Sequence, residues 1–166
     1  MEHGVLHLNE RYKNNMKLKT VIIVVGIIMS LVEKSEAVQV TSSLIDAICI
    51  VESAANAAAI GDDGKAIGMA QIHKVCVDDV NRIQKIKEAK LKRKLPRFTY
   101  DDRKNPTKSK EIMRIYLSWY GTNYERNTGK IATPEILSKI WNGGPNGWKK
   151  RATIAYWGKV RKALYA

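Results

Sequence analysis

Apolar residues recur at helical spacing along most of this chain, and patterns that alternate with a period of two are scarce. The first such run lies in residues 41–59 and has one apolar face. Thr41 or Ser42 can cap its start, and the alanines allow the helix to continue to Ala59, with Gly61 as its stop. The apolar face is formed by Leu44, Ile48, Val51 and Ala55.

Residues 61–65 have the composition of a turn, and a second helix is predicted from Lys74 to Ile86. The segment 85–97 follows, with seven basic residues against Glu88 alone. A segment so highly charged cannot bury a face, so we expect a solvated helix end or loop before Pro96.

Three further helices are predicted in the last third of the chain. The first is capped by Asn105 or Thr107, has Pro106 in its first turn and ends at Gly121; its expected buried stripe is Ile112, Ile115 or Tyr116, and Trp119. The next begins at 133–135 and is broken by 142–145, and the last runs from Trp148 to Leu164. Together these patterns predict an all-α domain of five or six helices with little or no sheet.

Residues 1–37 have the layout of a secretory signal peptide. Basic residues precede an uncharged apolar run, 20–32, and Ser35-Glu36-Ala37 places small residues at the two positions that a signal peptidase reads. The apolar run has 13 residues, fewer than the ~20 that span a bilayer. We expect cleavage after Ala37 and export to the periplasm or cell envelope. The alternative is an uncleaved inner-membrane anchor, and Met16 is an alternative start.

The excess of basic side chains indicates which partners the chain can bind. The chain has 29 basic and 16 acidic side chains, and residues 38–166 retain 24 and 12 of them. Such a surplus favours polyanions, either nucleic acid or the anionic cell-wall surface. The export signal favours the wall, and the chain has no recognisable nucleic-acid-reading motif, so we expect no nucleic-acid partner.

Two cysteines, Cys49 and Cys76, lie in the part expected to be exported. No C-x-x-C motif is present, which argues against a zinc or redox site. An oxidising compartment allows the two cysteines to form a disulfide, and two buried free thiols are the equal alternative. His73 has no second histidine at ligand spacing, so we read it as a polar loop residue and expect neither a metal nor a cofactor.

Glu52 is the candidate for acid chemistry. It follows Ile48 and Cys49 by one turn and can lie in the last turn of its helix. Apolar surroundings and the negative end of a helix dipole both raise the pKa of a carboxyl, as a general acid requires near neutral pH. An ordinary surface glutamate on an amphipathic helix is the alternative from position alone.

Four short motifs occur in order: Glu52-Ser53, then 68–71 (GMAQ), 141–145 (WNGGP) and 153–160 (TIAYWGKV). Their order resembles that of soluble lytic transglycosylases and goose-type lysozymes, which cut peptidoglycan glycan strands. The third motif departs from the family pattern Tyr-Asn-Ala-Gly-Pro at Trp141 and Gly143. The resemblance spans about residues 44–162 and implies a lysozyme-like SLT domain over 38–166, with the first helix ending just after Ser53.

The resemblance also implies roles for single residues. Glu52 would be the catalytic acid, and Gln71 would offer its amide to an N-acetyl group or a hydroxyl. Expected at the substrate are Ser53, Gly68, Gln71, Trp141, Asn142, Gly143 and Tyr156, with Trp148 a further stacking candidate. Each has a plainer reading as a loop brace, turn residue or core aromatic.

No second acid lies in any matched motif, although most glycosidases use two. Asp62, Asp63, Asp78 and Asp101 are candidates only by proximity in sequence. A single acid fits a monomeric lytic transglycosylase that forms 1,6-anhydro ends without a cofactor. Hydrolysis, with Asp62 or Asp63 holding a water, and a wall-binding protein without catalysis are the alternatives.

Overall fold

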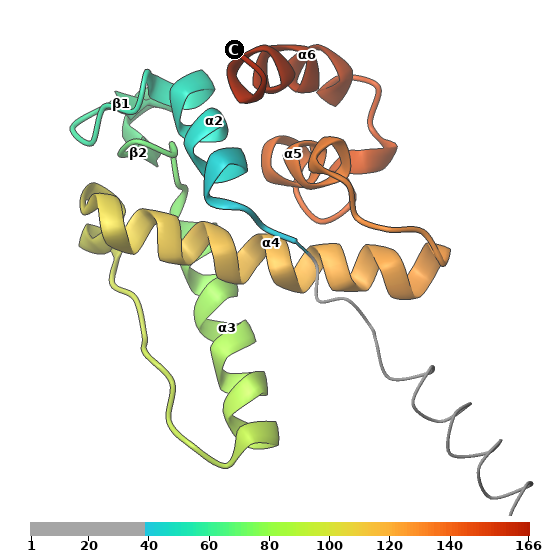
Figure 1. Ribbon diagram of the computed structural model, residues 1–166. Coiled ribbons are helices and arrows are strands. Elements are labelled where there is room, and N and C mark those ends of the chain that lie inside the picture. The colour runs from blue at the N-terminus through green and yellow to red at the C-terminus, as the bar shows by residue number, and fades with distance from the viewer. Residues whose placement is uncertain (1–38) are drawn as a thin grey trace, which may run out of the picture. The chain divides into compact units, whose positions relative to one another are not determined.

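The structure, a computed structural model, describes residues 39–166, and helices dominate them (Figure 1). The predicted signal segment, 1–37, lies outside the described residues. Five α-helices are present: α2 (Ser42–Ser53), α3 (Lys74–Leu91), α4 (Pro106–Thr128), α5 (Pro134–Gly143) and α6 (Thr153–Leu164). None of the helices in this described part is both long and apolar enough to cross a membrane.

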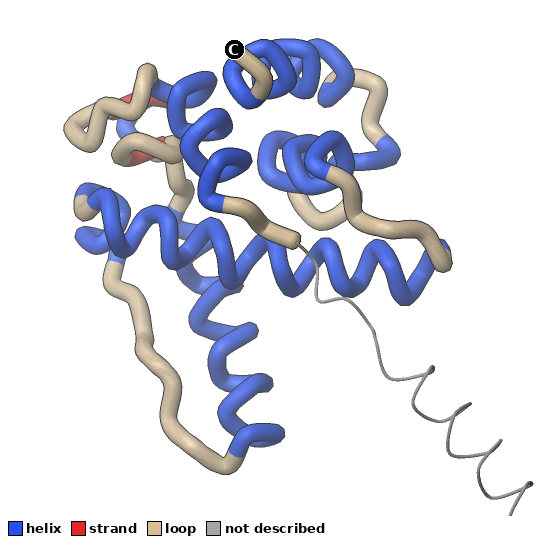
Figure 2. The backbone as a smooth tube through the Cα atoms, in the orientation of Figure 1, coloured by secondary structure: helices blue, strands red, loops and turns tan. Residues whose placement is uncertain are grey.

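Within residues 39–166 the sheet has two short strands, which are drawn in red in Figure 2. The strands β1 (Ile60–Gly61) and β2 (Ala66–Ile67) pair antiparallel, with Ile60 opposite Ile67, around a 3-10 turn at Asp62–Gly64. Short 3-10 helices also occupy Tyr100–Lys104 and Gly147–Lys149. The prediction of an all-α fold with little sheet is confirmed.

Three predicted helix starts are confirmed by their caps. The Thr41 hydroxyl accepts a hydrogen bond from the Leu44 N–H at 3.2 Å, and Thr133 caps α5 in the same manner ahead of Pro134. The Asn105 side chain accepts from the Lys108 N–H at 3.1 Å. These caps work locally, because each side chain satisfies a backbone N–H that has no partner within its own helix.

The predicted helix ends were less accurate. The helix α2 ends at Ser53, as the resemblance implied, and does not continue to Ala59 as its alanines allow, because Ala54 adopts a left-handed conformation with φ 54°. The helix α3 continues past Ile86 to Leu91. Gly121 does not end α4: it is buried inside a helix that reaches Thr128. Its place in a packed interface outweighs the cost of about 1 kcal/mol that glycine brings to a helix interior.

Two further expectations about the last third are corrected. Trp119 is only half-buried, and the buried face of α4 instead includes Met113 and Leu117. The last α-helix begins at Thr153 and not at Trp148, which lies in the 3-10 helix before it. Trp119 lies two residues from the buried Leu117 and Gly121, which is about 200° around the helix, so it does not share their buried face.

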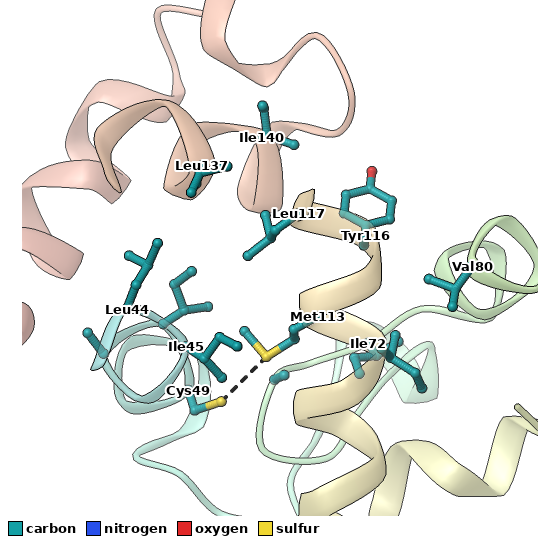
Figure 3. Packing of buried hydrophobic residues seen from close by; sticks show 14 of the residues in the cluster. Leu44, Ile45, Cys49, Ile72, Val80, Met113, Tyr116, Leu117, Leu137 and Ile140 are labelled. Atoms are coloured by element: carbon teal, nitrogen blue, oxygen red, sulfur yellow. Dashed lines mark hydrogen bonds between the residues drawn. The ribbon is translucent and has the colours of Figure 1, made fainter. Parts of the chain in front are cut away.

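The core lies where α2, α4 and α5 meet, as Figure 3 shows. Ile45 and Cys49 of α2 face Met113 and Leu117 of α4, with Leu137 and Ile140 of α5 completing the cluster. Each of these side chains is fully removed from solvent. Burial of a large aliphatic side chain stabilises the fold by roughly 1.5–3 kcal/mol, so this cluster fixes how the helices are placed.

A buried arginine holds the β1–β2 region in place. The Arg103 guanidinium donates to the carbonyl of Tyr100 at 2.7 Å and to those of Lys65 and Ile72, each at 3.1 Å. These bonds join the 3-10 helix before α4 to the hairpin and to the residues that follow it. Arg103 thus fixes the loop that carries the second sequence motif, and nothing in the sequence pattern singled it out.

Candidate active site

A cleft of about 420 Å³ lies between the C-terminal end of α2, the β1–β2 region, the start of α3 and the end of α5. Charged and polar side chains share its wall with apolar ones. Its lining includes Glu52, Asp62, Gln71, His73, Cys76, Tyr116, Trp141 and Asn142. Four of the residues predicted at the substrate, Glu52, Gln71, Trp141 and Asn142, therefore meet in one cavity, although they come from three separate segments of the chain.

Glu52 lies in the last turn of α2, half-buried, and is held by a partner from the far end of the chain. The Tyr156 hydroxyl on α6 donates to Glu52 Oε1 at 2.7 Å. Burial raises the pKa of Glu52 above its ordinary value, and hydrogen bonds from Tyr156 and Trp141 act in the opposite direction. Burial is the largest of these effects, so the carboxyl retains a proton at a higher pH than an exposed glutamate does.

Burial also raises the pKa of Tyr156, and the neighbouring Glu52 charge raises it further. This hydroxyl therefore stays protonated and acts as a donor to the carboxylate. Tyr156, one of the residues expected at the substrate, thus places its hydroxyl at Glu52 and is not only a core aromatic.

Trp141 lines the cleft, and its ring is fixed by Tyr116. The two rings meet edge to face with centroids 5.8 Å apart, and Tyr116 itself lines the cleft. Asn142 follows Trp141 and is exposed in the cleft wall. Sequence analysis missed Tyr116 as a site residue, because its helical spacing on α4 marks it only as a core position.

Gln71 faces the cleft and also braces its own loop. Its Nε2 donates to the Gly68 carbonyl at 2.9 Å, and its Oε1 lies where a side chain on Gly61 would be. One N–H of the amide is used within the loop, which leaves the other donor and part of the acceptor capacity available. Both readings of Gln71, brace and cleft contact, therefore have geometric support.

Ser53 does not line the cleft. Its hydroxyl donates to the Met69 carbonyl at 2.9 Å and accepts from the Asn56 N–H at 3.0 Å. These bonds fasten the end of α2 to the second motif. Ser53 therefore positions Glu52 against the Gly68–Gln71 turn, and the expected contact between Ser53 and substrate stays a prediction.

The glycines of the motifs are required by the protein's own packing. A Cβ on Gly68, whose φ is +79°, would lie 1.9 Å from the Arg103 carbonyl oxygen. A Cβ on Gly143 would lie 2.8 Å from Thr153 Cγ2. Neither glycine lines the cleft. The close approach that each permits in the structure is to another segment of the chain, and the approach of a sugar to the backbone at these positions stays a prediction.

Of the four aspartates considered as a second acid, Asp62 lines the cleft and the others do not. Its Oδ2 lies 3.4 Å from His73 Nε2, and both side chains are largely exposed. Asp78 instead accepts from the Tyr100 hydroxyl at 2.9 Å, and Asp101 pairs with Lys104. Asp62 reaches the cleft because the 3-10 turn between β1 and β2 turns this end of the hairpin toward α3.

Trp148 also lies outside the cleft, in a second cavity between α4 and the residues that follow α5.

Cys49 and Cys76 are free thiols, so the structure contains no disulfide between them. Cys49 Sγ lies 3.7 Å from Met113 Sδ in the core, whereas Cys76 lines the cleft. Within residues 39–166, no group of three or more His, Cys, Asp or Glu side chains could hold a metal ion.

Comparison with known proteins agrees with this geometry. The transglycosylase SLT domain family matches residues 29–159. Among solved structures, a chain of the crystal structure of Aeromonas hydrophila PliI in complex with Meretrix lusoria lysozyme is similar, with a TM-score of 0.57 and 22% identity. The match covers 74% of this chain and 89% of that chain, and at this identity it shows the fold alone. No curated protein matches the sequence.

The family match covers most of the chain and includes the four motifs in their expected order, except for the last residue of the fourth. The structure brings the cleft-lining members of these motifs together around one half-buried glutamate. The chain belongs to the transglycosylase SLT domain family.

Proposed function

We propose that this protein is an exported enzyme that cleaves the glycan strands of peptidoglycan, with Glu52 as its single general acid and base. The observation that carries the proposal is the state of Glu52. It lies in a cleft of about 420 Å³, its pKa is raised by burial, and its Oε1 accepts a 2.7 Å hydrogen bond from Tyr156. A carboxyl in this setting can donate a proton near neutral pH and is then stabilised as the anion.

The chemistry takes place in two proton transfers. Glu52 first protonates the oxygen of the β-1,4 bond between N-acetylmuramic acid and N-acetylglucosamine, and the bond from that oxygen to muramic C1 breaks. The muramic C6 oxygen then attacks C1, and the Glu52 carboxylate takes the proton from this hydroxyl. The products are a free N-acetylglucosamine hydroxyl and a 1,6-anhydromuramic end, and no water is consumed.

The cleft wall supports recognition of an N-acetylated sugar. Gln71 and Asn142 offer amide donors and acceptors, and Trp141 offers an aromatic surface. Because the indole of Trp141 also lowers the pKa of the Glu52 carboxyl, it links the binding surface to the acid. The net charge of +13 over the chain favours an anionic wall surface as the partner.

Digestion of purified peptidoglycan, followed by mass spectrometry of the fragment ends, tests the proposal. We expect 1,6-anhydromuramic ends and no reducing muramic ends. Glu52→Gln preserves the side-chain shape but cannot donate the proton, so activity should fall by about 10²–10⁴-fold. Glu111→Gln makes the same change outside the cleft and should leave activity unchanged. Cleavage by Glu52→Gln within a few-fold of the parent would remove Glu52 from the mechanism.

Hydrolysis is the second candidate, and the place of Asp62 favours it. Asp62 lines the same cleft as Glu52 and lies beside His73, so it could hold a water for attack at C1. Fragments heavier by one water, together with loss of activity in Asp62→Asn, would make the enzyme a lysozyme. A protein that binds purified glycan strands without shortening them would instead be a wall-binding protein on the same fold.

Export is the remaining part of the proposal. The basic, apolar and small-residue layout of residues 1–37 supports it. N-terminal sequencing of the exported protein should find a chain that begins at Val38. A protein retained in the inner membrane with residues 1–37 intact would favour the anchor.

A further inference from the structure

The positive charge of residues 38–166 is concentrated in two short segments. Residues 85–97 have seven basic side chains and one acidic one, and residues 149–162 have six basic side chains and no acidic one. The rest of residues 38–166 is balanced, with eleven side chains of each sign. The first segment, which we call the basic tip, lies outside the cleft, and the proposed catalytic steps do not use it.

The basic tip extends away from the other helices (Figure 1). It consists of the last turns of α3 and the loop that follows them, and Figure 2 shows this loop returning toward the start of α4. The buried residues of α3 end at Gln84, so the turns beyond it lie outside the core. A protruding end of this kind can contact a large partner without covering the cleft.

The loop of the basic tip is held against α3 by side-chain hydrogen bonds. Asn81 donates to the Phe98 carbonyl at 2.8 Å and accepts from the Phe98 N–H at 2.9 Å. Glu88 accepts from the Leu95 N–H at 2.7 Å and pairs with Arg97. The one carboxylate of the tip is therefore used within the tip, and the loop presents the remaining cations from a fixed backbone.

The other six cations of the tip have no partner of opposite charge. Within residues 39–166, Arg97 is the only cation of the tip that forms an ion pair. A shallow hollow of about 420 Å³ lies between α3 and the loop, and its wall consists of Lys85, Glu88, Ala89, Lys92, Arg93 and Lys94. The carbonyls at the end of α3 oppose this charge with only about half an elementary charge. The tip therefore attracts an anionic partner.

Shape and an exposed leucine decide which anionic partner fits the tip. Lys85, Lys87 and Lys90 leave the helix in different directions, because each residue turns by about 100°. A polymer chain that lies along one side meets only some of these cations, whereas a flat surface that approaches the end of the helix meets them all. Leu91, in the last turn of α3, is 53% exposed. A soluble polyanion offers nothing to this leucine, but the apolar edge of a bilayer can receive it.

We infer that the basic tip docks this protein on a membrane whose surface contains anionic lipids. The cations contact the headgroups, and Leu91 inserts between them. The inference does not depend on the cleavage chemistry at Glu52. Val75, at the start of α3, lines the cleft, and Leu91 lies about 24 Å further along the helix axis. A docked protein therefore holds its cleft away from the membrane surface, where long polymers can enter it.

Hydrogen–deuterium exchange of the full-length protein tests the inference, because it locates the contact along the chain. The probe is a vesicle of equal parts phosphatidylcholine and phosphatidylglycerol, and a vesicle of phosphatidylcholine alone is the neutral control. We expect the anionic vesicle to protect the amides of residues 85–97 and the neutral vesicle to leave them unprotected. The protection should fall as salt is added, since the range of such attraction is only about 10 Å at 0.1 M salt.

Two variants with the same change of charge measure the contribution of the basic tip. The first carries K85Q, K92Q, R93Q and K94Q, and the control carries K130Q, K159Q, R161Q and K162Q; all eight side chains are exposed. Each cation near an anionic surface contributes about fivefold to binding. The lipid concentration that gives half-maximal protection of residues 85–97 should therefore rise by about 10²-fold or more in the first variant and only about threefold in the control. Circular dichroism verifies that both variants fold.

Leu91→Ser distinguishes a membrane from a soluble polyanion. Loss of the inserted side chain should raise the half-protecting lipid concentration by about three- to fivefold. Ile131→Ser, at a position that is 77% exposed outside the tip, is the matched control and should not change it. Long-chain inorganic polyphosphate is the competing probe. Protection of the tip by polyphosphate at a phosphate concentration at which vesicles give none would assign the tip to a soluble polyanion and overturn the membrane assignment.

Two further results would refute the inference. One is protection by anionic vesicles that is confined to residues outside 85–97, because the contact would then lie elsewhere on the chain. The other is an equal loss in the two charge variants, because net charge alone would then account for the binding. Neither result affects the proposed function, since the digestion of peptidoglycan and the effect of Glu52→Gln are measured without vesicles.

Discussion

Replacing Tyr156 by Phe removes a single hydroxyl from the proposed site and leaves the ring in place. That hydroxyl donates at 2.7 Å to Glu52 Oε1, and the hydrogen bond lowers the pKa of Glu52 against the larger effect of burial. A hydrogen bond to a charged group contributes about 1.5–3 kcal/mol. Because the Glu52 side chain is only half-buried, water can replace part of the loss, and we take the lower end of this range.

The sign and size of the effect follow from this hydrogen bond. It favours the ionised carboxylate, so its loss raises the pKa of Glu52 further. About 1.5 kcal/mol corresponds to roughly one pH unit, since one unit is 1.36 kcal/mol. The general acid is active while protonated, and its activity falls as pH rises through this pKa. The basic limb of the kcat/KM profile should therefore move to higher pH by roughly one unit in Tyr156→Phe.

The same variant should lower the plateau activity. Once Glu52 has given up its proton, the Tyr156 hydroxyl stabilises the carboxylate that remains, and that interaction is stronger after proton transfer than before it. Loss of about 1.4 kcal/mol lowers the rate by about tenfold. The assay is turbidity clearing of purified peptidoglycan between pH 4 and 9. Tyr165→Phe, at an exposed position, is the control and should change neither quantity.

A basic limb that stays in place or moves to lower pH would refute the reasoning. An unmoved limb would mean that Glu52 does not determine it, and a downward shift would mean that the hydroxyl stabilises the protonated carboxyl. Circular dichroism of the variant separates these results from a loss of fold.

Three further outcomes follow from the packing. Burial raises the pKa of Glu52 above its ordinary 4.5, so the stability that protonated Glu52 contributes to the folded protein is lost as pH rises through the raised pKa. Glu52→Gln should therefore be more stable than the parent near neutral pH, and urea unfolding should find this difference lost at pH 4 and below. Gly68→Ala should lower the free energy of unfolding by about 3 kcal/mol or more, because the added Cβ overlaps the Arg103 carbonyl. Gly129→Ala is the control: Gly129 has a similar φ of +67° but open space around it, so the loss should be only about 1 kcal/mol. Equal losses in the two variants would contradict the overlap. Burial raises the pKa of Cys76 to about 12, so iodoacetamide at pH 8 should modify it much more slowly than in urea, and intact mass without reductant should show two thiols.

The starts of three helices and the burial that raises the pKa of Glu52 could be predicted from sequence because both depend on neighbours along the chain. Thr41, Asn105 and Thr133 cap their helices through bonds to residues three positions later. Glu52 has its apolar neighbours one turn back on the same helix. The order of the four motifs then indicated the family without any knowledge of the fold.

The helix ends and the roles of the motif residues were decided by contacts between distant segments. Gly121 reads as a stop, yet packing keeps it inside α4. Gly68 is small because the Arg103 carbonyl lies against it, and these two residues are 35 positions apart in the sequence. A local pattern contains no information about which backbone will approach from elsewhere, so such roles could not be assigned in advance.

The sequence by itself determined an all-α domain, the positions of its caps, and a glutamate with the setting of a general acid. The tertiary structure alone decided that Asp62 would share the cleft of that glutamate, that Tyr116 would line it, and that the ring of Tyr120 would lie against that of Tyr116. The physical reason is one of range. Capping and helical amphipathicity act within one or two turns, whereas the pKa of a buried carboxyl depends on every group that folding brings against it.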